Sequence, residues 1–293
     1  MKKFHYPTFI GTRLMALAMV FCTMGLMTSC STEDNSNTAR YSEPVRTYYM
    51  SVDATKGSNE ATSRTNRVLS LSGSTLSASW TIGERVYVQG TTNIPSTPTF
   101  WFDGYIQPQS PGTSTRLNGQ LSLPQGWEGS ISQYVGDAPE FTLQFPRSGE
   151  LDYTGQVGTL DDIAAKYDYA IATAVRFDIL EDHIKAINSA SFINQQAIVK
   201  FTLFEKNNET NVLSPTALTI NYGSESISLT SIPETTYTTN GGDGMLYVAI
   251  PGFSGDITLS ATVGTATYTY NKSSVTFQNG KYYDITVKMT KQQ

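Results

Sequence analysis

Apolar and polar residues alternate along most of this chain, in short runs separated by turn-forming Gly, Pro, Asn and Ser. Alternation of period two is typical of half-buried β-strands, and turn signals at roughly 8–12-residue spacing indicate a sandwich or barrel. In the first half of the chain, the apolar faces of the predicted strands carry Tyr48, Met50 and Val52; Leu76, Ala78 and Trp80; Val86 and Val88; Phe100 and Phe102; Leu121 and Leu123; and Phe141, Leu143 and Phe145.

From about residue 195 the alternation becomes more regular and predicts about eight further strands, enough for a second sandwich. Asn279-Gly280 is a strong hairpin signal, so the last two strands are expected to pair across it. The closing strand carries Tyr283, Ile285, Val287 and Met289 on its inner face. We therefore predict an all-β protein with an N-terminal domain over 45–190 and a C-terminal domain over 191–293.

One short helix is expected in the N-terminal domain. Thr159 suits the N-cap, and Asp162 stands where it could reach back in a capping box, ahead of Ile163 and two alanines. Residues 240–244 are rich in glycine but offer one carboxylate, fewer than a calcium loop needs, and are expected to form a hairpin turn.

The first 30 residues read as an export signal. Lys2, Lys3 and Arg13 precede an apolar run over 14–27, and small residues lead into Cys30. The run is short for a transmembrane helix. A cysteine at the cleavage point predicts a lipoprotein, with residues 1–29 removed, Cys30 acylated and residues 30–44 forming a polar tether. The alternative is an ordinary signal peptide with an incidental cysteine.

Composition excludes several classes of function. Loss of residues 1–30 removes three basic residues and no acidic one, which changes the net charge from −5 to −8 and argues against nucleic-acid binding. The mature chain keeps no thiol and a single histidine, His183, expected on an exposed strand or turn. Triad catalysis and the usual zinc sites are thereby excluded, and we expect no catalytic residues, metal or cofactor. A histidine-free glycosidase would need a carboxylate pair, and the spacing of Asp152, Asp168, Glu181 and Asp182 singles out none.

Four stretches together resemble the fimbrillin superfamily, the lipoprotein-derived pilins and pilin-like surface proteins of oral and gut anaerobes. They are RVLSLSG (67–73) with LSASWTIGERV (76–86); LQFP (143–146) with LDYTG (151–155) and GTLDDIA (158–164); NQQAIVKF (194–201); and GKYYDITV (280–287). The resemblance implies two tandem transthyretin-like sandwiches, a lipid anchor in the outer membrane and exposure at the cell surface. It carries no catalytic signature.

The resemblance also implies assembly by donor-strand addition. A trypsin-like protease would remove the first strand, 45–53 with Tyr48, Met50 and Val52, and a strand of another subunit would fill the groove. The following segment, 54–67, offers Lys56, Arg64 and Arg67, of which Arg67 and then Arg64 are the expected cleavage sites; the alternative is that they are ordinary loop residues. The C-terminal strand, with Tyr283, Ile285, Val287 and Met289, is the candidate donor.

Two further roles stay open at this stage. The subunit could accept a donor strand and give none, as a tip subunit or adhesin would. It could also stay tethered to the outer membrane as a lipoprotein that binds a glycan or a host protein.

Overall fold

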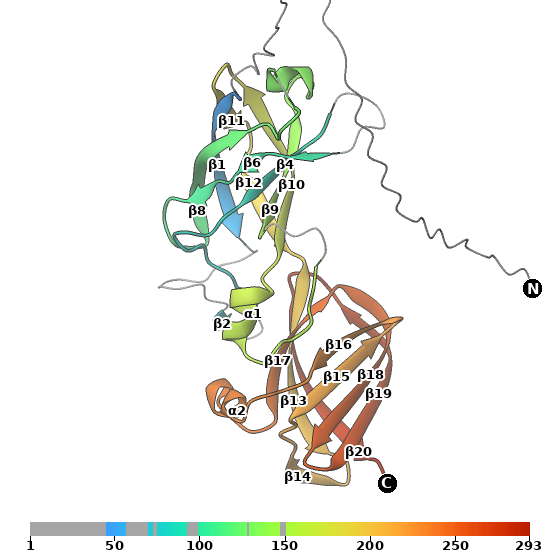
Figure 1. The fold of residues 1–293 in the computed structure, drawn as a ribbon. Coiled ribbons are helices and arrows are strands. Elements are labelled where there is room, and N and C mark those ends of the chain that lie inside the picture. The colour runs from blue at the N-terminus through green and yellow to red at the C-terminus, as the bar shows by residue number, and fades with distance from the viewer. Residues whose placement is uncertain (1–44, 57–69, 73–74, 93–98, 128, 147–150) are drawn as a thin grey trace, which may run out of the picture. The chain divides into compact units, whose positions relative to one another are not determined.

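The computed structural model describes residues 45–293 apart from 57–69, 73–74, 93–98, 128 and 147–150 (Figure 1). The predicted lipidation site Cys30 and the predicted cleavage sites Arg64 and Arg67 lie outside the described residues. The described chain is mostly strand, and its strands form a ten-stranded sheet, an eight-stranded sheet and a small two-stranded sheet. The predicted two-domain all-β sandwich fold is confirmed. Within the described residues, no helix has the length and apolar content needed to cross a membrane.

The ten-stranded sheet has the order β5-β4-β9-β10-β11-β1-β8-β6; β12 also pairs with β1 and β10, and β7 with β8. The bounds are β1 (Thr47–Lys56), β4 (Tyr87–Gly90), β5 (Phe100–Trp101), β6 (Asp103–Gly104), β7 (Gln107–Pro108), β8 (Ser114–Ser122), β9 (Glu140–Phe145), β10 (Ala170–Ile179), β11 (His183–Ala186) and β12 (Ala190–Asn194). A 3-10 turn spans Ile131–Gln133, and β2 (Ser70–Ser72) pairs with β3 (Thr75–Ser77).

The alternating apolar residues of these strands meet in one core. Tyr48, Met50, Trp80, Phe102, Leu121 and Phe145 are among its buried members. Side chains of a strand alternate between its two faces, and most of the predicted inward residues reach this core, whereas Ala78 is buried in the second core described below.

The eight-stranded sheet has the order β14-β13-β20-β19-β18-β15-β16, and β17 also pairs with β13, along the edge that faces away from β20. Its strands are β13 (Gln196–Glu205), β14 (Asn208–Val212), β15 (Ala217–Tyr222), β16 (Glu225–Leu229), β17 (Met245–Pro251), β18 (Phe253–Val263), β19 (Ala266–Phe277) and β20 (Tyr282–Lys291). The sequence predicts about eight strands here, but β14 was not predicted, and β19 joins two strands that were predicted separately. The inward residues of these strands form a second core.

The helix α1 (Leu160–Lys166) begins as predicted, with the Thr159 hydroxyl accepting a hydrogen bond from Asp162 N at 3.2 Å. Asp162 reaches further back than a capping box requires, because its carboxylate accepts from Val157 N at 3.0 Å. Ile163 and Ala164 pack into the second core, beside β17. The helix that the sequence places in the first domain therefore contributes to the second core.

A second helix, α2 (Thr235–Asn240), was not predicted. Gly241 ends it in the left-handed conformation, with φ of 87°, which glycine adopts without steric cost. The prediction of a hairpin turn over 240–244 is corrected here, since this segment connects a helix to β17. The run of threonines in α2 has low helix propensity, and packing of Thr236 and Tyr237 outweighs it.

Candidate functional site

The first strand is held by neighbours on both sides. Its residues Thr47 to Thr55 pair antiparallel with β8, and on the other side β1 pairs in parallel with β11 and then β12 (Figure 1). Residues beyond Asp53 keep this pairing, so the strand continues to Lys56 and the prediction that it stops at Asp53 is corrected. A strand in this position satisfies the main-chain groups of two neighbours at once.

The inner face of β1 fills a groove between these neighbours. Its inward residues, none more than 2% exposed, are Tyr48, Met50, Val52, Ala54 and Lys56. The Tyr48 hydroxyl also accepts a hydrogen bond from Ile131 N at 2.9 Å. Burial of a large apolar side chain stabilises by about 1.5–3 kcal/mol, so Tyr48, Met50 and Val52 together contribute roughly 5–9 kcal/mol. Without β1 the groove would expose this apolar surface to water.

Lys56 lies at the end of this inner face, where the alternation would place an apolar residue. Its Nζ is 2.8 Å from Asp168 Oδ2 and 3.4 Å from Glu84 Oε1, and all three side chains are buried. The ammonium also lies 4.1 Å from the ring centroid of Phe145 and 5.0 Å from that of Trp80. Lys56 is thus a core residue, and its interpretation as a protease-accessible loop residue is wrong.

The carboxylates of this cluster come from two distant segments. Glu84 lies in the turn before β4, and Asp168 lies between α1 and β10. Asp168 Oδ1 also accepts a 3.5 Å hydrogen bond from the buried Gln196 side chain. A buried carboxylate needs a cation or several donors near it. We call Lys56, Glu84 and Asp168 the lysine cluster.

The outer face of β1 carries an exposed ion pair. Arg116 on β8 donates from Nε to Asp53 Oδ1 at 2.8 Å and from Nη2 to Asp53 Oδ2 at 3.1 Å. This guanidinium holds the pKa of the Asp53 carboxyl below its usual range. Tyr49 lies on the same face, and the centroid of its ring is 5.8 Å from that of the His183 ring, in an edge-on arrangement. His183 is exposed at the start of β11, as the sequence predicts.

The candidate donor residues lie on β20. Val287 and Met289 are buried, while Tyr283 and Ile285 are partly exposed. The strand pairs in parallel with β13 over eight residue pairs but meets β19 at only two, Tyr268 with Lys291 and Thr269 with Thr290. A tight turn does form at Asn279-Gly280, closed by Lys281 N donating to Gln278 O at 3.1 Å. The two strands on either side of this turn pair only at their far ends, on the edge of β20 that faces away from β13.

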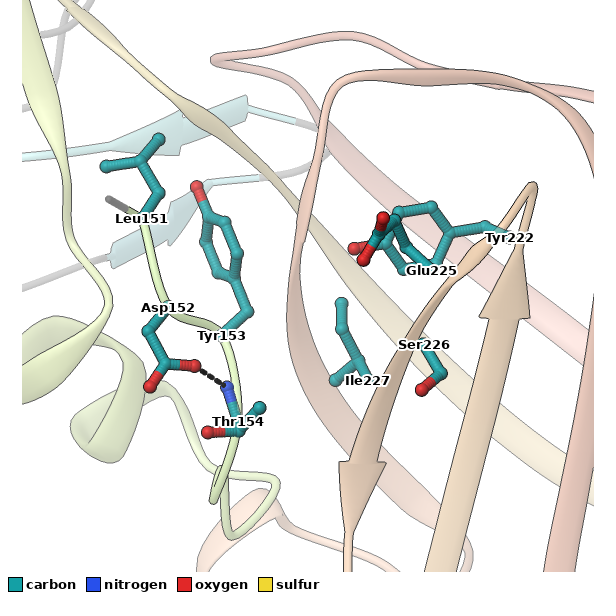
Figure 2. Close-up of a pocket in the computed structure, with 8 residues that line it drawn as sticks. All are labelled: Leu151, Asp152, Tyr153, Thr154, Tyr222, Glu225, Ser226 and Ile227. Atoms are coloured by element: carbon teal, nitrogen blue, oxygen red, sulfur yellow. Dashed lines mark hydrogen bonds between the residues drawn. The ribbon is translucent and has the colours of Figure 1, made fainter. Parts of the chain in front are cut away.

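A pocket of about 310 Å³ lies elsewhere, between the segment 151–154 and the ends of β15 and β16. Figure 2 shows Tyr153 and Tyr222 on opposite sides of it, with Asp152 and Glu225. Asp152 accepts a 2.9 Å hydrogen bond from Thr154 N, which lowers the pKa of its carboxyl. Burial raises the pKa of the Tyr153 and Tyr222 hydroxyls.

The four carboxylates considered for glycosidase chemistry have different surroundings. Asp152 binds the backbone of Thr154, and Asp168 belongs to the lysine cluster. Glu181 and Asp182 are exposed beside β11, where Asp182 contacts His183. Among the described residues, no group of three or more His, Cys, Asp or Glu side chains is placed to hold a metal ion.

Comparisons with known proteins give structural matches alone. No protein-family model matches the chain, and no curated protein does. Among solved structures, it is similar to a fimbrial protein from Bacteroides ovatus (11% identity, TM-score 0.40, 83% of this chain) and spans about half of that protein, 49%. It is also similar to the tip fimbrial protein Mfa3 from Porphyromonas gingivalis (8% identity, TM-score 0.39, 83% of this chain and 95% of that one).

A candidate cell adhesion protein from Parabacteroides distasonis gives a third match (9% identity, TM-score 0.41, 82% of this chain and 88% of that one). The matches are fimbrial and cell adhesion proteins of Bacteroidetes, the kind of protein that the sequence resembles. At these identities and TM-scores, the likeness assigns no role to any residue of this chain.

Proposed function

We propose that this chain is a non-enzymatic cell-surface protein, a fimbrial subunit or fimbrillin-like adhesin that assembles by replacement of its first strand. The precursor is exported, acylated at Cys30 and held on the outer membrane. Cleavage after Arg67 or Arg64 then frees β1, and a strand of another subunit takes its place.

The position of β1 carries this proposal. It is the first described strand, it pairs on both sides, and its inner face is buried. Loss of such a strand leaves two rows of unpaired main-chain groups and a bare apolar groove. A replacement strand restores both the hydrogen bonds and the burial, so refilling of the groove is strongly favoured.

The pocket in Figure 2 favours a second candidate role, that of a tethered lipoprotein which binds a glycan or a host protein. Tyr153 and Tyr222 offer aromatic faces, while Asp152 and Glu225 offer hydrogen-bond acceptors, a combination suited to a sugar. Binding of a panel of host glycans that is lost on Tyr222→Ala would support this role, and unchanged binding would remove the pocket from it.

Limited trypsin treatment of the chain from residue 31 to 293 tests strand replacement. We expect a cut after Arg67 or Arg64, seen by intact mass, followed by filaments in electron micrographs. The double variant Arg64→Gln, Arg67→Gln is the control and should resist that cut. Cleavage without filaments would indicate a subunit that accepts a strand but donates none. Absence of any cut in this segment would contradict the maturation step and favour the tethered role.

A further inference from the structure

The pocket of Figure 2 has two aromatic walls that the surrounding structure holds in place. On one side, the Tyr153 hydroxyl donates to Gln195 O at 3.1 Å, and the ring centroid of Tyr169 lies 5.6 Å from that of Tyr153. On the other side, Phe253 lies edge-on to Tyr222, with 5.4 Å between the ring centroids. Both walls are therefore ordered before a ligand enters, which lowers the entropic cost of binding.

Glu225 stands where the alternation of β16 would place an apolar residue. Leu229 and Ile227 of this strand are buried in the second core, and Glu225 continues the same face at the two-residue spacing. Glu225 is also the partner of Tyr222 across the β15–β16 hairpin, so their side chains project from one face as neighbours. The carboxylate makes no hydrogen bond or ion pair with another described residue. Its position therefore has no explanation in the packing of the strand.

Asp152 brings a second carboxylate from the opposite side of the pocket (Figure 2). The segment that carries it is fixed at two points, because Asp152 Oδ1 accepts from Thr154 N and Asp152 O accepts from the Tyr169 hydroxyl at 3.1 Å. The residue is exposed. A ligand in the pocket would thus meet one carboxylate on each side.

The pocket is negatively charged, and nothing among its described lining balances that charge. The described residues that line it include two acids but no lysine, arginine or histidine. Burial and the Glu225 carboxylate both raise the pKa of the Tyr222 hydroxyl, so this hydroxyl stays neutral at pH 7. A ligand with one positive charge would be attracted to such a site, and an anionic ligand would be repelled.

The volume and the hydroxyl groups of the pocket indicate the body of that ligand. A volume of about 310 Å³ lies at the lower end of the range for ligand pockets and suits a single sugar ring. The face of a tyrosine ring is a flat apolar surface for the C–H groups of a pyranose, and it also attracts an ammonium group. The hydroxyls of Tyr222 and Ser226 can donate and accept hydrogen bonds, as sugar hydroxyls require.

We propose that this pocket binds an amino sugar whose amine is free and protonated, with the ammonium group between Asp152 and Glu225 and the sugar ring against Tyr222. The inference rests on the second proposed role, that of a tethered lipoprotein, and names the class of sugar that its pocket takes. N-acetylation of the same sugar removes the positive charge and keeps the ring. The pocket would therefore distinguish the free form from the acetylated form.

Ligand-observed NMR titration of the chain from residue 31 to 293 tests the proposal. Glucosamine, N-acetylglucosamine and glucose share one ring and differ in charge, while cadaverine carries ammonium groups without a ring. The variants are Tyr222→Ala and the double variant Asp152→Asn, Glu225→Gln, which removes both charges but keeps an oxygen acceptor for Thr154 N. Glu181→Gln is the matched control, because it removes the same charge from an exposed site beside β11.

We expect glucosamine to bind at least about tenfold more tightly than N-acetylglucosamine or glucose, because hydrogen bonds to a charged group are stronger than neutral ones. The double variant should bind glucosamine and N-acetylglucosamine equally, and Glu181→Gln should keep the preference for glucosamine. Cadaverine should bind more weakly than glucosamine, since it has no ring to place against Tyr222.

Two results would overturn the proposal and leave the second role standing. The first is equal binding of glucosamine and N-acetylglucosamine to the unmodified protein, lost for both in Tyr222→Ala, which would indicate a site for neutral sugars. The second is a preference for glucosamine that survives in the double variant, which would place the amine elsewhere. Cadaverine that binds as tightly as glucosamine would overturn the assignment to a sugar. If none of these ligands binds, the pocket has no part in the second role either.

Discussion

Removal of the Lys56 ammonium is the sharpest test of how the first strand is held in the intact chain. Lys56→Met keeps most of the side-chain volume and its contacts with Phe145 and Trp80, but removes the ammonium that pairs with Asp168 and Glu84 in the core. Breaking a buried ion pair from one side costs about 3–5 kcal/mol, a large share of a typical 5–15 kcal/mol of stability.

Urea unfolding followed by tryptophan fluorescence measures this loss in the right place. The three tryptophans of the chain are Trp80, Trp101 and Trp127. All three lie between residues 80 and 127, the segment that includes β4 to β8 of the ten-stranded sheet. With a urea slope of about 2 kcal/mol per molar, 3–5 kcal/mol lowers the unfolding midpoint by roughly 1.5–2.5 M.

Two controls make the result interpretable. Arg116→Met removes a cation from the exposed pair with Asp53, whose side chains are 61% and 64% exposed, and should shift the urea midpoint little, because water screens such a pair. The triple variant Lys56→Met, Glu84→Gln, Asp168→Asn removes the charges together and should recover most of the loss. If Lys56→Met lowers the midpoint no more than Arg116→Met does, the lysine cluster does not hold β1 in place.

Three further predictions concern other parts of the fold. Gly119→Ala should lower the free energy of unfolding in urea by about 1–3 kcal/mol, because the added Cβ would lie 2.2 Å from Tyr105 O. Gly136→Ala is the control and should be close to neutral, because a Cβ there meets nothing within 4 Å. Thr159→Ala should cost about 1 kcal/mol in thermal unfolding by loss of the α1 cap, and Thr159→Ser should keep most of it. Burial raises the pKa of the Tyr153 and Tyr237 hydroxyls. As the pH rises past about 10, the same tyrosines ionise in the unfolded chain but stay protonated in the folded protein. The free energy of unfolding should therefore be full below about pH 10 and fall above it. Phenolate absorbance should then show a late fraction of tyrosines that ionises together with the loss of circular dichroism, and ionisation of all tyrosines before unfolding would contradict this.

Local pattern determined much of this protein. The inner faces of β1 and β20 follow from alternation alone, and Tyr48, Met50, Val52, Val287 and Met289 are buried as predicted. The Thr159 cap is equally local, since a hydroxyl meets an amide three residues ahead. Such features depend on neighbours in the chain, and strand and cap geometry repeat with fixed spacing.

Tertiary structure decided which strands pair and which charge is buried. The Asn279-Gly280 turn forms as its sequence predicts, yet β20 has eight residue pairs with β13, a strand far earlier in the chain, and only two with β19. Local sequence does not reveal this partner, because main-chain hydrogen bonding is the same for nearly every residue type. Lys56 follows Tyr48, Met50, Val52 and Ala54 at the same two-residue spacing. This spacing is the signal in the sequence that could have revealed its burial. Its hydrogen-bonded carboxylate Glu84 is 28 residues away in the sequence, and a lysine is buried only where the fold brings anions to it.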